Sequence, residues 1–189
     1  LTRELTLTAA DLGLLTSAYL LAFAAFQIPL GLLLDRYGPR RVEAGLLLVA
    51  AAGTLLFAIS RSPVELTVAR GLIGLGVSSC LMAAFKGFAQ NFPAERQASL
   101  TGAIMASGGL GALTASLPLE FALPLLGWRG VFQGLTFLLL AVAALIFFSV
   151  PQREAGVSRD SLGAQLKDVG GILAHRVFWR FAPPMTLVT

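Results

Sequence analysis

Long uninterrupted runs of apolar residues are separated along the chain by short polar segments. Crossing about 30 Å of hydrocarbon takes roughly 20 helical residues at 1.5 Å per residue. Runs of about that length cover residues 12–34, 42–59, 64–90, 97–117 and 130–150. The runs do not alternate between apolar and polar residues, as the strands of a transmembrane barrel would. Because backbone polar groups in lipid must be paired within helices or a closed barrel, the pattern predicts an all-α, multi-pass transmembrane helical bundle.

The polar segments between the runs carry signals for helix starts and stops. Thr8 and Asp11 predict a capping-box-like start for the first run. The start of the third run is marked by an N-cap residue, a first-turn proline and a capping carboxylate, which are Ser62, Pro63 and Glu65. After the fourth run, we expect three residues to break the helix: Pro118, Pro124 and Gly127.

The chain after the fifth run is polar. Residues 151–176 are predicted to form a loop between bundles, and residues 177–189 begin a further apolar segment. Within the loop, apolar residues at helical spacing predict a short amphipathic helix at the membrane surface: Leu162, Leu166, Val169 and Leu173. Because the chain starts at Leu1 and stops inside an apolar segment, we expect it to be a piece of a longer protein.

A cleavable signal peptide is the alternative interpretation of the first apolar run. That run exceeds the usual signal core of about 7–15 residues and lacks a strongly basic leader. We therefore interpret it as a membrane span.

Composition agrees with a membrane protein. Hydrophobic residues make up 56% of the chain, charged residues 13%, and the mean hydropathy is +0.80, whereas soluble domains carry about 25% charged residues. The net charge of +4 would suggest nucleic-acid binding in a soluble protein. Here the basic residues lie in short loops, so membrane topology explains them better and we expect no nucleic-acid partner.

The basic residues concentrate on one side of the predicted membrane. If the loop at residues 36–41 is cytoplasmic, nine basic residues share its side: Arg36, Arg40, Arg41, Arg96, Arg153, Arg159, Lys167, Arg176 and Arg180. The opposite side holds three: Arg3, Arg61 and Arg129. The positive-inside rule therefore puts the start of the chain outside. Twelve arginines against two lysines indicate a GC-rich bacterial gene, so we expect a bacterial inner (plasma) membrane.

Cysteine and histidine are too scarce for several kinds of site. Cys80 is the single cysteine and His175 the single histidine. This excludes an internal disulfide framework and a metal site built from cysteines and histidines.

The turn after the first run carries a dense pattern of glycines and charges. Gly31 lets a neighbouring helix approach closely, and Gly38 with Pro39 permits a tight turn. Asp35 can pair with the arginines or face the positive N-terminus of another helix. The pattern resembles the signature loop between helices 2 and 3 of the major facilitator superfamily, and the matching residues are Gly31, Asp35, Arg36, Gly38, Arg40 and Arg41. A generic basic turn between two membrane helices is the alternative.

Two further segments resemble the same superfamily. Residues 70–76, Arg-Gly-Leu-Ile-Gly-Leu-Gly, are similar to the arginine-glycine pattern of helix 4, and residues 126–132 resemble the loop before helix 6. The resemblance covers nearly the whole chain. It implies helices 2 to 6 and the start of helix 7, with helix 1 and the C-terminal bundle missing. It also implies transport without covalent chemistry and without a bound cofactor.

The fourth run departs from one pattern of the superfamily. Antiporters often carry a glycine-proline pair within helix 5, but residues 102–111 contain no proline. The resemblance therefore favours a symporter or facilitator of small organic anions over a drug/proton antiporter.

Arg70, Lys86 and Glu120 are the candidate functional charges in or near the spans, where a charge at mid-depth costs about 2.5–3.5 kcal/mol by insertion scales. Arg70 either snorkels outward or, as the resemblance implies, lines the central cavity for substrate binding or proton coupling. Lys86 either snorkels or attracts an anionic substrate. It is sixteen residues from Arg70, about 4.4 helical turns, so the two do not form one cluster. Glu120 is either solvated at the interface or, if buried, a proton-coupling carboxylate.

Small residues recur within two of the runs. Such faces let membrane helices pack closely, and the predicted packing glycines are Gly74, Gly76, Gly108, Gly109 and Gly111. None follows a predicted strand, so a dinucleotide-binding motif is not indicated.

The leading hypothesis is a secondary active transporter that moves a small solute, such as an organic anion, by alternating access and with proton coupling. Its partners would be the small-molecule substrate, the lipid bilayer and the missing C-terminal bundle. An integral membrane enzyme is an alternative, but the spans lack an acid–base or metal constellation. A non-catalytic membrane subunit is a third possibility.

Overall fold

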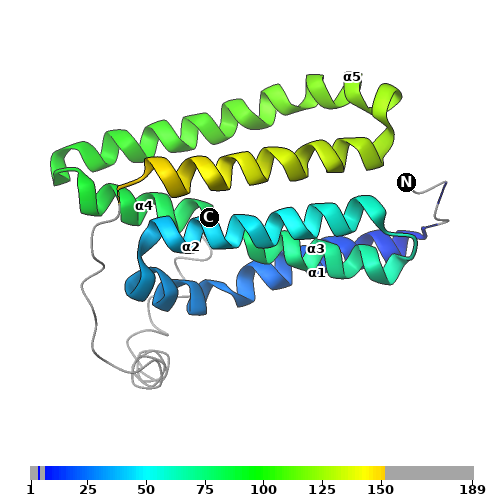
Figure 1. Cartoon of the computed structure of the whole chain (residues 1–189), viewed down its shortest axis with the longest axis horizontal. Helices are drawn as coiled ribbons and strands as arrows, with labels where there is room; N and C mark the ends of the chain where they lie inside the picture. Colours follow the sequence, from blue (N-terminus) through cyan, green and yellow to red (C-terminus); the bar gives the residue numbers. More distant parts are fainter. Residues whose placement is uncertain (1–3, 5–6, 152–189) are drawn as a thin grey trace, which may run out of the picture. The chain divides into compact units, whose positions relative to one another are not determined.

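The computed structural model describes residue 4 and residues 7–151, without the side chain at position 117. Five helices follow one another: α1 (Ala9–Ala25), α2 (Gln27–Ile59), α3 (Pro63–Val77), α4 (Cys80–Asn91) and α5 (Ala94–Ser149) (Figure 1). The described residues contain no strand, which confirms the all-α fold class. The amphipathic helix expected between residues 162 and 173 and the apolar segment 177–189 lie outside the described residues.

Helix α2 is a hairpin of two passes joined at Gly38. This glycine has φ 78° and ψ 162°, outside the helical region, in a conformation that a residue with a Cβ rarely adopts. Residues on either side of it share one buried cluster, with Leu30 and Leu34 before the turn and Val42 and Leu46 after it. Their symmetric spacing about Gly38 means that the chain folds back on itself, as Figure 1 shows.

Helix α5 also contains a reversal, at Gly127, where φ is 65° (Figure 1). Pro118 and Pro124 lie inside the helix before it, so the prediction that these prolines break the helix is wrong. Proline removes one backbone donor, but membrane helices tolerate it because neighbouring groups and small local adjustments compensate. The glycine turns the chain because it alone reaches the required backbone conformation.

Two other breaks interrupt a pass without a left-handed residue. Phe26 separates α1 from α2, and its backbone stays near the right-handed helical region. Ser78 and Ser79 separate α3 from α4 with similar backbone angles. The stretch Pro63–Asn91 accordingly behaves as one long apolar helix.

Helical stretches long and apolar enough to cross a bilayer are Gln27–Ile59, Pro63–Asn91, Ala94–Ser116 and Pro118–Ser149; Ala9–Ala25 is shorter. Many large apolar side chains on these helices are exposed, for example Leu113, Leu125 and Phe148. A soluble protein rarely exposes contiguous apolar surface on this scale. The architecture is that of a multi-pass membrane protein.

Both predicted capping boxes are present. Thr8 accepts from the backbone N–H of Asp11, whose carboxylate accepts from the backbone of Thr8. Ser62 and Glu65 form the same reciprocal pair at the start of α3. These bonds satisfy backbone donors that a helix N-terminus leaves unpaired.

Helix α3 approaches its neighbours at glycines. A Cβ added at Gly74 would lie 2.3 Å from the backbone oxygen of Tyr19 in α1, and one at Gly76 would lie 2.4 Å from the backbone nitrogen of Ala50 in α2. By contrast, an added Cβ at Gly108, Gly109 or Gly111 would meet nothing within 4 Å. The glycine face of α5 therefore packs against none of the described residues.

Candidate functional site

An ion pair joins α2 to α4 beside the Gly38 turn. The Nζ of Lys86 donates to Oδ1 of Asp35, with side chains that are 23% and 61% exposed. We name this end of the bundle, with Gly38, Lys86 and the end of α5, the turn end. The sequence predicted that Asp35 pairs with arginines or a helix N-terminus, whereas the structure pairs it with Lys86. Pairing lowers the cost of holding both charges at the membrane boundary.

Each arginine of the signature turn has a different environment. The Arg40 guanidinium lies 4.7 Å from the ring centroid of Phe147 in α5, a cation–π distance. Arg36 lies over the adjacent Tyr37, and Arg41 is exposed. A Cβ at Gly31 would meet nothing within 4 Å, so the expected close approach of a helix at Gly31 is not made by the described residues.

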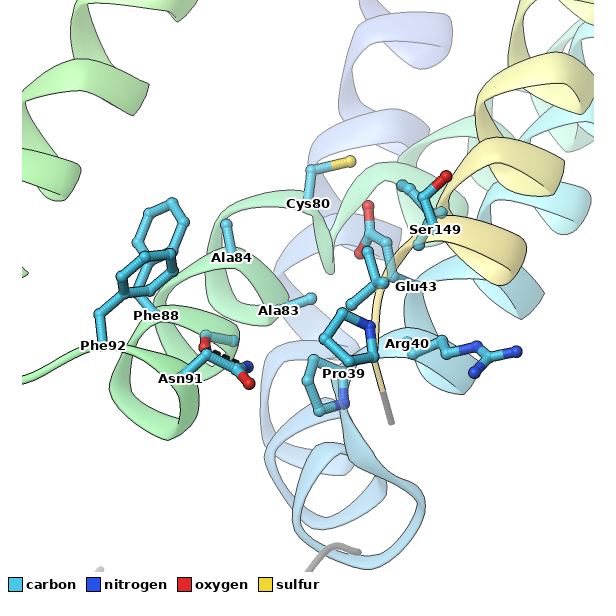
Figure 2. A pocket seen from close by; sticks show the side chains of 14 residues that line it. Pro39, Arg40, Glu43, Cys80, Ala83, Ala84, Phe88, Asn91, Phe92 and Ser149 are labelled. Atoms are coloured by element: carbon cyan, nitrogen blue, oxygen red, sulfur yellow. Dashed lines mark hydrogen bonds between the residues drawn. The ribbon is translucent and has the colours of Figure 1, made fainter. Parts of the chain in front are cut away.

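A cavity of about 420 Å³ lies next to this turn (Figure 2). It lies between the start of the second half of α2, helix α4, and the end of α5. Its lining is mostly apolar and includes Pro39, Arg40, Glu43, Cys80, Phe88, Phe92, Ile146 and Ser149. Glu43 is the acidic residue of this lining.

Glu43 was not singled out from the sequence. It is 7% exposed, and its Oε2 is buried without a hydrogen-bond partner among the described residues. Ser79 and Cys80 face the carboxyl group, and the Oγ of Ser79 is likewise buried without such a partner. The sequence signal that could have identified Glu43 is its position as an acid about one turn beyond Pro39, inside an otherwise apolar run.

Arg70 lies on an aromatic cluster formed by residues of α2 and α5, toward the end of the bundle where α2 ends and the chain turns at Gly127. Its guanidinium carbon is 4.9 Å from the ring centroid of Phe57 in α2 and 6.0 Å from that of Phe132 in α5. The two rings stack with centroids 4.1 Å apart. Arg70 is half-buried and has no ion pair with a described residue. Its guanidinium thus rests on rings of two other helices.

The segment after Gly127 closes the other end of the bundle. Arg129 Nη1 donates to the backbone oxygens of Ala58 and Ser60, each at 2.9 Å, and so caps the end of α2. Its Nη2 donates to Glu4 at 3.1 Å, and Trp128 Nε1 donates to the same carboxylate at 2.6 Å. The hydrogen bonds from Trp128 and Arg129 lower the pKa of Glu4. The sequence marked this segment only by its resemblance, without a role for either side chain.

Glu120 is exposed on α5. It makes no hydrogen bond or ion pair with the described residues. Arg70, Lys86 and Glu120 are therefore not brought together in one cluster. Their predicted parts in substrate binding or proton coupling stay predictions.

Comparison with known proteins decides the family. The Major Facilitator Superfamily matches residues 1–189. The chain belongs to this superfamily. The resemblance to the superfamily is thereby confirmed, and the family is one of transporters, not enzymes.

Members of the superfamily similar to this chain come from bacteria and fungi. The hexuronate transporter of Escherichia coli K12 is 26% identical over 203 residues, covering 99% of this chain and 47% of the relative. A probable sulfoacetate transporter of Cupriavidus necator, SauU, is 27% identical over 162 residues, covering 84% and 38%. The MFS-type transporter phomT of Diaporthe leptostromiformis is 30% identical over 151 residues, covering 77% and 25%. The chain thus spans less than half the length of these relatives.

Proposed function

We propose that this superfamily chain supplies one helical bundle of a secondary transporter that moves a small organic anion together with protons. In alternating access, such a bundle rocks against a second one around a site near the middle of the membrane. Two relatives support an anionic solute, since one is named as a hexuronate transporter and one as a probable sulfoacetate transporter.

The observation that carries the proposal is the environment of Arg70. A half-buried guanidinium with no carboxylate partner in the described part of the chain has donors available for a ligand. Guanidinium groups bind carboxylates and sulfonates through paired, charge-assisted hydrogen bonds. The rings of Phe57 and Phe132 hold the cation in place without neutralising it. An anion arriving at Arg70 would supply the missing charge.

The ion pair at the turn end fits the same proposal. Lys86 and Asp35 tie α4 to α2, so they hold together the passes that would have to move as one unit. The predicted attraction of an anion by Lys86 then requires this pair to open. We propose that Arg70 is the main anion contact and that the pair stabilises the bundle.

Uptake by the protein encoded by the complete reading frame tests the proposal. Labelled glucuronate and sulfoacetate, two probes of the proposed class, are offered to proteoliposomes with and without an inward proton gradient. We expect gradient-dependent uptake that Arg70→Ala reduces by about tenfold or more, since losing a charge-assisted contact costs about 1.5–3 kcal/mol. Arg70→Lys should retain part of the uptake because it keeps the charge but not the planar fork.

Arg61→Ala is the matched control, because Arg61 is an exposed arginine two residues before α3 begins. It should transport as the unchanged protein does. Normal uptake by well-inserted Arg70→Ala protein would contradict the assigned role of Arg70.

A further inference from the structure

We propose that Glu43 takes up and releases the proton that is coupled to transport; this rests on the proposed function above. The residue lies on α2, about one turn beyond the Gly38–Pro39 turn, and lines the cavity at the turn end (Figure 2).

The burial of Glu43 favours the neutral acid in this conformation. An ionised carboxylate withdrawn from water is costly unless it is paired and fully hydrogen-bonded. Glu43 is 93% buried by its 7% exposure, and one of its oxygens has no hydrogen-bond partner among the described residues. A bound proton removes the negative charge of Glu43, which would otherwise be buried without compensation.

No cation in the surrounding elements compensates for this acid. On α2, Arg40 lies one turn earlier, and its guanidinium is over the ring of Phe147. On α4, Lys86 pairs with Asp35, and the neighbours that face the carboxyl group are the hydroxyl of Ser79 and the thiol of Cys80. The end of α5 contributes Ser149 to the cavity but no charge. Within the described residues, Glu43 therefore has neutral polar neighbours and no salt bridge.

The geometry points to a proton rather than to a larger cation. Oε2 is buried, so a hydrated metal ion or an organic cation does not reach this oxygen in this conformation. The described residues also hold no group of three or more histidine, cysteine, aspartate or glutamate side chains suited to a metal ion. A proton needs no additional space.

The cavity supplies a route for that proton. It extends from Glu43 past Pro39 and Arg40 at the signature turn (Figure 2). When water enters the cavity, Glu43 can give its proton to that water and become a solvated carboxylate; the reverse step takes one proton from water. The break at Ser78–Ser79 between α3 and α4 lies against the carboxyl group of Glu43. A change in the charge of Glu43 therefore acts at the point where the helix is already interrupted.

Infrared difference spectroscopy on the complete protein in lipid tests the proton site without a substrate. Between neutral and more alkaline pH, where exposed carboxylates stay ionised, the unchanged protein should show the carbonyl stretch of a buried protonated carboxylic acid. Glu43→Gln should lose that band, because an amide of nearly the same shape cannot titrate. Glu95→Gln, which replaces an exposed glutamate at the start of α5, should keep it. An unchanged band in Glu43→Gln overturns the assignment.

A transport assay with glucuronate as the probe tests the coupling. Glu43→Gln should lose accumulation above equilibrium under a proton gradient but still exchange labelled for unlabelled glucuronate across the membrane. A merely structural role would reduce both activities together, so a parallel loss, or normal accumulation, overturns the coupling role. If the unchanged protein moves no glucuronate, the proposed substrate class fails for this probe, and the infrared band still decides whether Glu43 holds a proton.

Discussion

The charged side chains of the bundle differ in how their charge is compensated. Asp35 and Lys86 neutralise each other, and Arg40 and Arg70 lie over aromatic rings, an interaction worth about 0.5–2 kcal/mol. Glu43 has neither kind of partner among the described residues. Glu43, whose charge would have no oppositely charged or aromatic partner among those residues, is thus the residue to which we assign proton uptake and release.

The Glu4 carboxylate should make one end of the bundle sensitive to acid. Its pKa is lowered by hydrogen bonds from Trp128 and Arg129. A group with a lowered native pKa stabilises the fold above its unfolded pKa, and that contribution is lost as the pH falls through the native pKa. In a background in which every other tryptophan is replaced by phenylalanine, we expect the fluorescence of Trp128 to change during acid titration, below the usual range for glutamate.

Glu4→Gln should abolish this fluorescence transition, because an amide does not titrate. Glu95→Gln, a change at an exposed glutamate at the start of α5, should leave it intact. The same transition in Glu4→Gln protein would show that another group is responsible.

At the scale of elements, sequence patterns anticipated the helices and some of their ends. Ser62 and Glu65 carry short-range capping chemistry, and Gly38 combines a glycine with a following proline, so both signals are local and readable. Pro118 and Pro124 misled because a proline in lipid does not have to end a helix. The break at Ser78–Ser79 carries no glycine or proline and was not anticipated.

The site was less predictable than the helices, because its contacts are between distant residues. Asp35 and Lys86 are both conspicuous in the sequence, yet only the packing of α4 beside the turn shows that they pair. Glu43 is a single acid in an apolar run and looks unremarkable until its burial is known. The ring partners of Arg70 come from two other helices.

Close approach between α3 and α2 gives a prediction at this scale. A Cβ at Gly76 would meet the backbone nitrogen of Ala50 at 2.4 Å and the backbone oxygen of Leu46 at 2.6 Å. Backbone atoms cannot rotate away, so we expect Gly76→Ala to destabilise the protein by about 1–3 kcal/mol. The measurement is thermal unfolding in detergent.

Gly71→Ala is the control on the same helix, since a Cβ there would meet nothing within 4 Å. It should unfold at the temperature of the unchanged protein or slightly higher. Equal stability of the two variants would mean that α3 and α2 are not in tight contact at Gly76.

At the scale of the whole molecule, the two ends of the bundle differ in charge. The turn end holds Arg36, Arg40, Arg41 and Lys86. The opposite end, where the chain turns at Gly127, holds Arg61 and Arg129. Such asymmetry orients membrane proteins with the basic side in the cytoplasm. We infer that the turn end, with Glu43 and its cavity, faces the cytoplasm.

Cysteine labelling of intact cells tests this orientation. In a background with Cys80→Ala and no other cysteine, the matched variants Arg41→Cys and Arg61→Cys each put one thiol at an exposed arginine position on opposite ends. A membrane-impermeant maleimide should label the Arg61→Cys protein from outside and leave the Arg41→Cys protein unlabelled until the cells are opened. Labelling in the opposite order would reverse the topology.

The position of Cys80 has a practical consequence. The single sulfhydryl of this sequence lies on the wall that also holds Glu43. An environment-sensitive dye attached there would report on hydration next to the acid without any engineered anchor. This part of the protein thus carries its own attachment point for following the hydration of the cavity.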